Sequence, residues 1–244
     1  MPTFVSGKDV AVNFKKYDLT PYFNNATTTR EAETAETTAF GSDDRTYVAG
    51  MKTGTVSVEG MFDGSADAVD EVLATIIFSS DNTDAPLTML MGGTTVGRTC
   101  VLSLPNETSY EVTSPVDEIV AVTAEFQSNN QIENGVVLAG NLAVSTTSTG
   151  SAVDNAASSA NGGVAHLHVT ANTRNGTAVA KVQHSANNST WADLVTFTTI
   201  STGTTTSQRS VVNSGTTVNR YLRALITPAG STGSLTVTVA FARR

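Results

Sequence analysis

The chain has 244 residues, of which 15% are charged and 6% aromatic, and its formal net charge is −8. This length is enough for one large domain or two ordinary domains, each with its own core. The single Cys100 excludes an internal disulfide, and the N-terminus lacks the basic and apolar regions of a secretory signal, so we expect folding in a reducing cytoplasm. No apolar run approaches the roughly twenty residues that cross a bilayer, which predicts no membrane insertion.

Charge divides the chain near residue 145. Residues 1–145 hold twenty of the 22 carboxylates and seven of the 14 Lys and Arg residues, a net charge of −13. Residues 146–244 hold only Asp154 and Asp193 against seven basic side chains, a net charge of +5. Opposite signs indicate that the two halves meet different surroundings, of which the acidic one repels phosphate.

Alternating apolar residues predict several strands in the first half. Three runs each place their apolar residues on one face: Val10, Val12 and Phe14; Leu87, Met89 and Met91; and Val120, Val122, Ala124 and Phe126. Each run is typical of a strand with one buried face. The abundance of Thr, Ser, Asn and Gly also favours strands and turns over helices.

Residues 24–46 form a polar, Thr-rich stretch without a period that could bury a face. Structureless loops of this length are uncommon in compact domains and are usually functional or disordered. We therefore predict a long loop, for which two interpretations stay open. It is either a flexible surface loop or a segment that becomes ordered against a partner subunit.

One segment follows a helical period. Its apolar residues stand at i, i+3, i+4, i+7 and i+8, in the order Val69, Val72, Leu73, Ile76 and Ile77. Ser65 is a candidate N-cap, and Asp67, Asp70 and Glu71 lie where carboxylates stabilise a helix N-terminus. This predicts an amphipathic helix over about residues 65–77, packed on a sheet.

The second half predicts a separate β domain. Residues 143–162 are mostly small and polar, which indicates a flexible linker. Alternation then returns in four runs: Ala165, Leu167 and Val169; Ala178, Ala180 and Val182; Leu222, Ala224 and Ile226; and Leu235, Val237, Val239 and Phe241. Turn signals separate these runs, so we expect an all-β sandwich, immunoglobulin-like or jelly-roll, over residues 163–244. The fold class is thus mainly β, with residues 1–142 as a first domain.

The sequence offers little that could support catalysis. Gly92, Gly97, Arg98 and Thr99 approach the phosphate-binding pattern G-x-x-x-x-G-K-[ST], but Arg98 replaces the lysine and a strand pattern follows instead of a helix. We expect a hairpin loop there. Nucleophile motifs are missing and Cys100 lies in a predicted strand, so we predict no enzyme, no catalytic residue and no cofactor.

Two further features each have a functional and a plain structural interpretation. His166 and His168 project from one face of a strand and could hold a metal, but only His184 remains to join them. We therefore favour exposed polar positions for both and predict no metal site. Trp191 could stack on a sugar, although a lone tryptophan beside a turn more often packs on the edge of a sandwich.

A series of short motifs runs in a fixed order through about the first 140 residues. It comprises a first strand, a long loop leading to T-x-F-G with an arginine nearby, and a glycine-punctuated strand ending in F-D-G. The positions are Thr38, Phe40, Gly41, Arg45, Gly50, Gly60, Phe62, Asp63 and Gly64, and a later strand follows over residues 116–127. This order resembles the major tail tube proteins of long-tailed (siphovirus-like) bacteriophages. The C-terminal region resembles β-sandwiches appended to such subunits.

The resemblance implies a structural protein of the virion tail. It implies hexameric rings that stack into a hollow tube, through which genomic DNA passes at ejection without specific binding. It also implies assembly in the host cytoplasm with a tape-measure protein and with tail terminator and tip proteins. The residues expected to contact other subunits or rings are Glu31, Glu33, Glu36, Thr38, Phe40, Gly41, Asp43, Asp44 and Arg45. Carboxylates in a bore would repel DNA phosphates, and Glu125 is the candidate for the lumen.

Other functions stay open beside the tube. The C-terminal region could bind a host-cell-surface glycan, because its net charge of +5 suits anionic polymers and many copies on one particle would raise avidity. The chain could also be a capsid or tail decoration protein. Deleting residues 150–244 would show whether this region is an accessory or a part of the tube wall.

Overall fold

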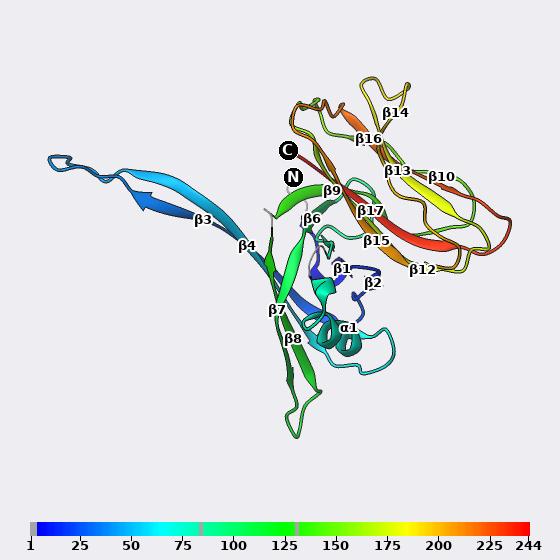
Figure 1. The fold of residues 1–244 in the computed structure, drawn as a ribbon, viewed down its shortest axis with the longest axis horizontal. Coiled ribbons are helices and arrows are strands. Elements are labelled where there is room, and N and C mark those ends of the chain that lie inside the picture. Colours follow the sequence, from blue (N-terminus) through cyan, green and yellow to red (C-terminus); the bar gives the residue numbers. More distant parts are fainter. Residues whose placement is uncertain (1–3, 83–84, 130–131) are drawn as a thin grey trace. The chain divides into compact units, whose positions relative to one another are not determined.

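The computed structural model describes residues 4–82, 85–129 and 132–244, and its fold is mainly β, as the sequence predicts. The chain forms two compact units (Figure 1). Unit 1 comprises Met1–Pro21, Ala85–Leu102 and Glu133–Arg244, and unit 2 comprises Tyr22–Asp84 and Ser103–Ile132. Each unit contains its own sheets.

Unit 1 consists of two sheets. The larger has eight strands in the order β15-β12-β17-β9-β6-β5-β1-β2. The bounds are β1 (Ala11–Phe14), β2 (Tyr17–Asp18), β5 (Leu87–Leu90), β6 (Thr99–Ser103), β9 (Glu133–Val144), β12 (Gly163–Asn172), β15 (Thr206–Val212) and β17 (Leu235–Arg243), with a short 3-10 helix η1 (Gly7–Asp9) before β1. The smaller sheet has the order β10-β16-β13-β14, with β11 also paired to β16. Its bounds are β10 (Ser148–Thr149), β11 (Val153–Asp154), β13 (Ala178–Ser185), β14 (Ala192–Thr196) and β16 (Tyr221–Pro228).

The core of unit 1 lies between these two sheets. Leu167 and Val239 from the larger sheet share one buried cluster with Val182 and Leu222 from the smaller sheet. The four alternating runs of the second half therefore bury the faces that the sequence predicts. The larger sheet also curls: Thr88 on β5 hydrogen-bonds to β12, although these strands are not neighbours in the sheet.

The strand order of unit 1 differs from the contiguous domains expected over residues 1–142 and 163–244. β9 runs past residue 142 and pairs with β6 on one side and β17 on the other. The stretch 143–162, expected as a linker, contains β10 and β11, and both pair with β16. Strands from both parts of the sequence thus share one sheet. Alternation alone does not reveal this, because it does not encode strand order.

Unit 2 is a four-stranded antiparallel sheet with one helix. The strand order is β3-β4-β8-β7. The bounds are β3 (Phe23–Glu36), β4 (Tyr47–Met61), β7 (Pro105–Thr113) and β8 (Ala121–Ser128), with α1 (Val69–Ile76) and a 3-10 helix η2 (Ser80–Asn82). The predicted apolar stripe of α1 is buried, and the hydroxyl of Tyr110 on β7 donates to Asp70 of α1 at 2.8 Å.

The helix begins four residues later than the predicted start at Ser65. Asp67 has a left-handed backbone with φ of 61°, which a right-handed helix cannot include. The N-cap residue is Ala68, and its side chain makes no capping hydrogen bond, so the expected cap at Ser65 is wrong. Glu71 instead accepts the backbone N–H of Asp67 at 2.7 Å, which keeps a carboxylate at the positive end of the helix.

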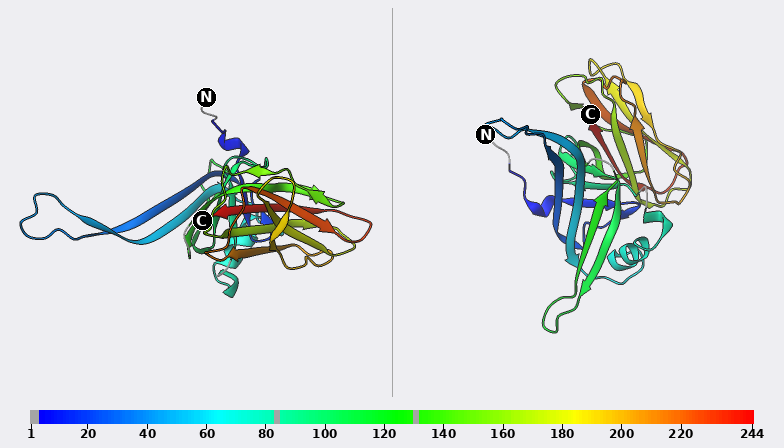
Figure 2. Two further views of the ribbon diagram at one scale, coloured as in Figure 1. Left: turned by 90° about the horizontal axis from the view of Figure 1, so that it is seen from above. Right: turned by 60° about the vertical axis from the view of Figure 1, so that its left-hand side comes forward.

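The loop predicted over residues 24–46 is mostly a strand. β3 and β4 form a long twisted hairpin with paired residues from Phe23↔Gly60 to Glu36↔Tyr47, and only residues 37–46 connect them (Figure 2). The distal part of β4 pairs with β3 alone, because β8 begins its pairing at Thr55. Side chains on both faces of that distal part are exposed, so no apolar period could have marked the strand.

Candidate assembly surfaces

One face of the unit 2 sheet is buried and the other is open. Val56 of β4 lies opposite Phe126 of β8, and Val58 lies opposite Ala124, so these four buried side chains share the face on which α1 packs. Gly60 continues this face, where a Cβ would come within 2.0 Å of the Tyr22 carbonyl oxygen. The residues between them point to the other side of the sheet.

The open face carries acidic side chains. Exposed carboxylates from all four strands lie on it, and we call it the acidic face: Glu31 on β3, Glu59 on β4, Glu111 on β7 and Glu125 on β8. Cross-strand partners fix this placement, because Glu125 lies opposite Ser57, and Thr123 lies between Glu59 and Glu111. The other described strand residues of this face are mainly Thr, Ser, Asn and Gln, and none of them is Lys or Arg.

The sequence had indicated Glu125 and Glu31 but not their two neighbours on this face. Val56 and Val58 are buried, so alternation along β4 places Glu59 on the opposite, open face. The sequence could therefore have indicated that Glu59 shares this face with Glu125. Glu111 follows only from the pairing of β7 with β8, which no local pattern shows. Glu59 accepts a hydrogen bond from Asn25 at 3.1 Å, and the described residues offer these carboxylates no ion pair.

The tip of the β3–β4 hairpin is closed by backbone and threonine contacts. Thr37 N–H donates to the Thr46 carbonyl oxygen at 2.8 Å, and Thr46 N–H donates to Thr38 Oγ1 at 3.0 Å. Beyond this closure Phe40 is fully exposed, and Gly41 has φ of 88°, a left-handed conformation that favours glycine. An ordered tip therefore presents an aromatic side chain to solvent.

The nine residues expected to contact other subunits all lie on this hairpin. Glu31, Glu33 and Glu36 are on β3, and the rest are in the tip: Thr38, Phe40, Gly41, Asp43, Asp44 and Arg45. Arg45 approaches Glu36 at 4.0 Å, and both side chains are largely exposed, so this pair adds little stability. The distal strand adds further exposed apolar residues that the sequence had not indicated, namely Tyr47, Val48 and Met51.

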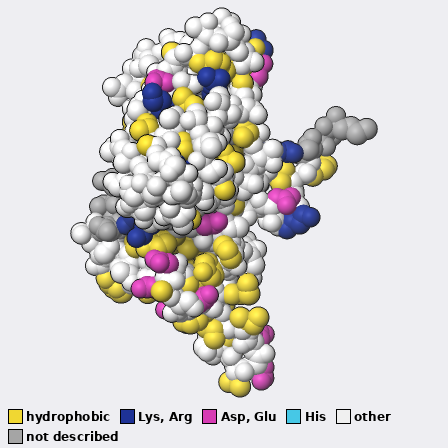
Figure 3. Space-filling model, turned by 90° about the vertical axis from the view of Figure 1, so that its right-hand side faces the viewer, with side chains coloured by type: hydrophobic (Ala, Val, Ile, Leu, Met, Phe, Trp, Pro, Cys, Tyr) yellow, Lys and Arg dark blue, Asp and Glu magenta, His cyan; other side chains and the backbone are white. Residues whose placement is uncertain are grey.

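A second exposed apolar region lies around the β7–β8 turn. Val116 and Ile119 are exposed, and a shallow hollow beside them is lined by residues 117–121 together with Asn24, Gly60 and Met61. Figure 3 shows hydrophobic and acidic side chains side by side over the lowest part of its view, where this hairpin lies. Residues 105–128 contain no Lys or Arg.

Glu107 is a buried carboxyl group on the covered face of β7. Its residue is 3% exposed, and neither carboxyl oxygen has a hydrogen-bond partner among the described residues. Burial raises the pKa of Glu107 to about 8, because the charged form would lose its hydration without compensation. The backbone of Glu107 is bonded on its outer edge by Asn82, which donates to its carbonyl oxygen (2.8 Å) and accepts its N–H (2.6 Å).

The two histidines of β12 are buried, which corrects the expectation of exposed polar positions. Thr88 Oγ1 lies 2.8 Å from His168 Nε2 and 3.0 Å from His166 Nδ1. His168 Nδ1 lies 2.7 Å from the Lys15 carbonyl oxygen and must donate to it, so Nε2 of the neutral ring accepts from the Thr88 hydroxyl. Burial lowers the pKa of His168 to about 4 and that of His166 well below its usual value.

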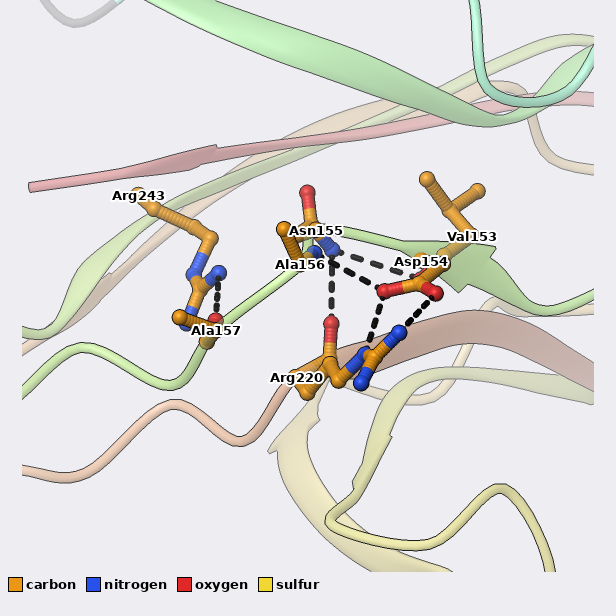
Figure 4. A network of polar contacts seen from close by, with 7 residues as sticks. All are labelled: Val153, Asp154, Asn155, Ala156, Ala157, Arg220 and Arg243. Atoms are coloured by element: carbon orange, nitrogen blue, oxygen red, sulfur yellow. Dashed lines mark hydrogen bonds and ion pairs between the residues drawn. The ribbon is translucent and has the colours of Figure 1, made fainter.

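Most basic side chains of residues 146–244 are bound within unit 1. Figure 4 shows Arg220 in a two-bonded pair with Asp154, and Arg243 donating to the Ala157 carbonyl oxygen. Arg174 is buried and donates to four backbone carbonyl oxygens. Arg244 pairs with Glu133. The positive excess therefore mainly fixes loops and strand ends and is not a free basic surface.

The remaining sequence motifs hold no catalytic arrangement. Residues 91–98 connect β5 to β6 as a turn with left-handed Gly93 and Gly97, in agreement with the expected loop. Cys100 is buried, and burial raises its thiol pKa to about 12. Among the described residues, no group of His, Cys, Asp and Glu side chains could hold a metal ion. Within the same ranges, no helix has the length and hydropathy of a membrane span.

Comparisons with known proteins place the chain in a family. The model of the phage tail tube protein family matches residues 7–134, just over half of the chain. No curated protein matches significantly. The chain is similar to a structure from the virion of a native gene transfer agent particle, with 17% identity, a TM-score of 0.43, and coverage of 54% of this chain and 98% of that chain.

Two further structures are tail assemblies. The tail of an empty gene transfer agent particle, determined with C6 symmetry, has 19% identity, a TM-score of 0.42, and coverage of 53% of this chain and 97% of that chain. The SPP1 tail tube has 9% identity, a TM-score of 0.43, and coverage of 57% and 81%. The family match rests on the part of the sequence that carries the tail tube motifs. The chain therefore belongs to the phage tail tube protein family, whose members are structural, non-enzymatic components of the virion tail.

Proposed function

We propose that this chain polymerises into stacked hexameric rings that form the hollow tail tube of a long-tailed (siphovirus-like) phage, and that genomic DNA passes through the bore at ejection. Assembly takes place in the host cytoplasm around a tape-measure protein and ends at terminator and tip proteins. The ring number and these partners follow from the resemblance to tail tube proteins. The bore and the ring contacts are argued from residues of unit 2.

The acidic face of unit 2 is the observation that carries the proposal. A surface along which DNA slides must repel phosphate, because each Lys or Arg side chain in contact with a phosphate would add salt-dependent affinity. Glu31, Glu59, Glu111 and Glu125 supply negative charge with no Lys or Arg on the same face. We assign this face to the lumen, while the opposite face packs on α1.

The β3–β4 hairpin supports the contact between rings. Its tip exposes Phe40, and its distal strands have no core of their own, so a partner surface would bury apolar area that the monomer leaves in water. A head-to-tail contact of this kind repeats and can extend a stack without limit. Phe40, Gly41 and Arg45 are the tip residues assigned to it.

Electron microscopy of the purified protein tests the assembly. We expect tubes or stacked rings from the wild type and a large loss of polymer from Phe40→Ala, with the thermal unfolding of the monomer unchanged. Thr27→Ala, on the proximal part of the same hairpin, serves as the control. Globular monomers under every assembly condition would contradict the tube, and the same image would show whether the chain instead decorates a capsid or tail.

The lumen assignment is tested by charge reversal. Tubes assembled from Glu59→Lys/Glu125→Lys in the presence of short duplex DNA should pellet with DNA that resists nuclease, whereas wild-type tubes should pellet without it. Two variants of unit 1 serve as controls. Asp9→Lys makes one charge reversal, and Asp9→Lys/Asp18→Lys makes the same total charge change as the test variant. If tubes of the unit 1 double variant trap as much DNA, the acidic face does not line the lumen.

Contact with the host surface through the C-terminal strands is a second candidate function. It is favoured by a basic side chain of the smaller sheet whose terminal N–H groups have no acceptor among the described residues. That side chain is Arg223, which stacks on Trp191.

A further inference from the structure

A row of polar side chains crosses three strands on the outer face of the smaller sheet of unit 1. Arg223 of β16 lies opposite Gln183 of β13, which lies opposite Asp193 of β14. Arg223 Nε donates to Gln183 Oε1 at 2.9 Å, and Gln183 Nε2 donates to Asp193 Oδ1 at 2.8 Å. Lys181 Nζ completes the row with a 2.6 Å bond to Asp193 Oδ2. The core residues of these strands alternate with this row and point to the other side.

Trp191 supports the guanidinium of Arg223 from one side. The Arg223 carbon Cζ lies 4.1 Å from the centroid of the Trp191 ring, a cation–π contact. The loop before Trp191 is ordered by Asn187, whose Oδ1 accepts the backbone N–H groups of Ser189 and Thr190 at 3.0 and 2.9 Å. Arg223 covers one face of the ring, so that face is closed to the stacked sugar considered from the sequence.

Arg223 differs from five of the other basic side chains of the C-terminal half. Lys181, Arg220 and Arg244 pair with carboxylates, and Arg174 and Arg243 donate to backbone carbonyl oxygens. Arg223 has only the neutral Gln183 oxygen, which takes its Nε–H. Its two Nη groups, like the indole N–H of Trp191, have no hydrogen-bond acceptor within the described residues. Partial burial lowers the pKa of Arg223, as expected for a cation without a counter-ion.

We propose that Arg223, held on Trp191, binds the carboxylate of an acidic saccharide such as a uronic acid residue. The free Nη edge of a guanidinium matches a carboxylate with two parallel hydrogen bonds. Because Gln183 and Trp191 fix the guanidinium before the ligand arrives, little side-chain entropy remains to be lost.

The surroundings of Arg223 favour a sugar acid over other anions. One unpaired cation suits a single negative charge, whereas a phosphate group is better matched by several cations. Tyr221 lies two residues away on the same face, with Arg220 stacked on one side of its ring at 4.9 Å from the centroid, and the loop residues Asn187, Ser189 and Thr190 are small and polar. A flat site of this kind binds weakly as a single copy, and display of many copies would strengthen it.

Binding of the full-length protein to immobilised polygalacturonate tests the site, with dextran as the neutral polymer and poly-glutamate as a peptide carboxylate. We expect Arg223→Gln to weaken binding to polygalacturonate roughly tenfold or more, because it removes charge-assisted hydrogen bonds. Arg223→Lys should restore only part of it, since an ammonium cannot form the two-bonded fork. Arg45→Gln removes the same charge from unit 2 and should leave binding unchanged. Dextran should not be bound.

Several outcomes would overturn the proposal. Equal binding by Arg223→Gln and wild type would exclude the site, and an equal loss in Arg45→Gln would assign binding to net charge. Poly-glutamate bound as tightly through Arg223 would indicate a protein partner instead of a saccharide. Thermal unfolding of Arg223→Gln by circular dichroism confirms that the variant is folded. The test uses the unassembled protein, so its result does not depend on whether the chain forms tubes.

Discussion

Unit 1 binds most of its charged side chains internally, whereas unit 2 presents them to solvent. In unit 1, Arg174 is buried among backbone carbonyl oxygens, and Arg220 and Asp154 hold each other in a two-bonded pair. In unit 2, the carboxylates of the acidic face have no ion pair among the described residues, and the hairpin tip leaves Phe40 in water. The contrast indicates that unit 1 is complete as a monomer, while unit 2 has surfaces that only association can cover.

Each unit also buries titratable side chains in their neutral form, and their ionisation destabilises unit 1 at low pH and unit 2 at high pH. Unit 1 buries His166 and His168 as neutral bases, so acid opposes its fold. Unit 2 buries Glu107 as a neutral acid, so alkali opposes its fold. A change of pH can therefore destabilise one unit at a time.

Deletion of residues 150–244 should have the largest effect, because it removes β15, β12 and β17 from one end of the larger sheet of unit 1. β9 would lose β17, and Thr88 would lose both histidine partners. We expect loss of the cooperative unfolding transition of unit 1, measured by circular dichroism and limited proteolysis. Replacing residues 37–46 by a two-residue turn is the control and should leave folding intact. A stable, cooperatively folded 1–149 fragment would instead support contiguous domains.

Glu107→Gln should change the pH dependence of unit 2. The folded pKa of about 8 exceeds the ordinary 4.5, so the folded state holds a proton that the unfolded chain releases. Stability is therefore full below about pH 4.5 and falls as the pH rises to about 8, by roughly 5 kcal/mol at 1.36 kcal/mol per pKa unit. The variant cannot ionise and should lack this fall in urea titrations. Parallel curves for the two proteins would rule out a buried, protonated Glu107.

His168→Gln should reduce the loss of folding stability that unit 1 shows as the pH falls. The folded pKa of about 4 lies below the ordinary 6.5, so the unfolded chain takes up a proton first as the pH falls. Stability is full above about pH 6.5 and decreases by roughly 3 kcal/mol toward pH 4. Thr88, the Lys15 carbonyl group, His166 and Arg209 are the polar and charged groups around this site. Burial also lowers the pKa of the half-buried His184 of the smaller sheet, so His184→Gln should have a smaller effect in the same direction. An unchanged loss of stability at acidic pH in His168→Gln would contradict the assignment.

The sequence could predict a helix or strand wherever one of its faces is buried and the other is exposed to solvent. The run from Val122 to Phe126 on β8 and the stripe of α1 gave such a contrast, and both elements form. β3 gave none, because its distal part is exposed on both faces; only its threonines, which favour strands, pointed to it. β12 forms as predicted, but the expected exposure of His166 and His168 was wrong, because both faces of this strand are covered.

The candidate surfaces were predictable only in part, because they depend on strand pairing. Local alternation predicted the strand face of Glu125, and the order of motifs pointed to the tip residues. The acidic face as a whole needs the register of β3, β4, β8 and β7, which brings together residues as distant as Glu31 and Glu125. Arg223 and Trp191 likewise meet through pairing of β13 with both β14 and β16. Long-range register is the information that a single sequence does not express locally.

Asn82→Ala should have the smallest effect and tests how unit 2 limits its own association. The Asn82 amide occupies the outer N–H and C=O of Glu107 on the edge strand β7, as a neighbouring strand would. Its loss should lower the unfolding free energy of unit 2 by about 1–2 kcal/mol, measured by urea titration, with Ser114→Ala in the exposed β7–β8 turn as the control. Because an open strand edge can pair with another chain, light scattering should also show more self-association than in the wild type. If neither quantity changes, Asn82 does not protect this edge, and the restraint on lateral pairing must come from elsewhere on β7.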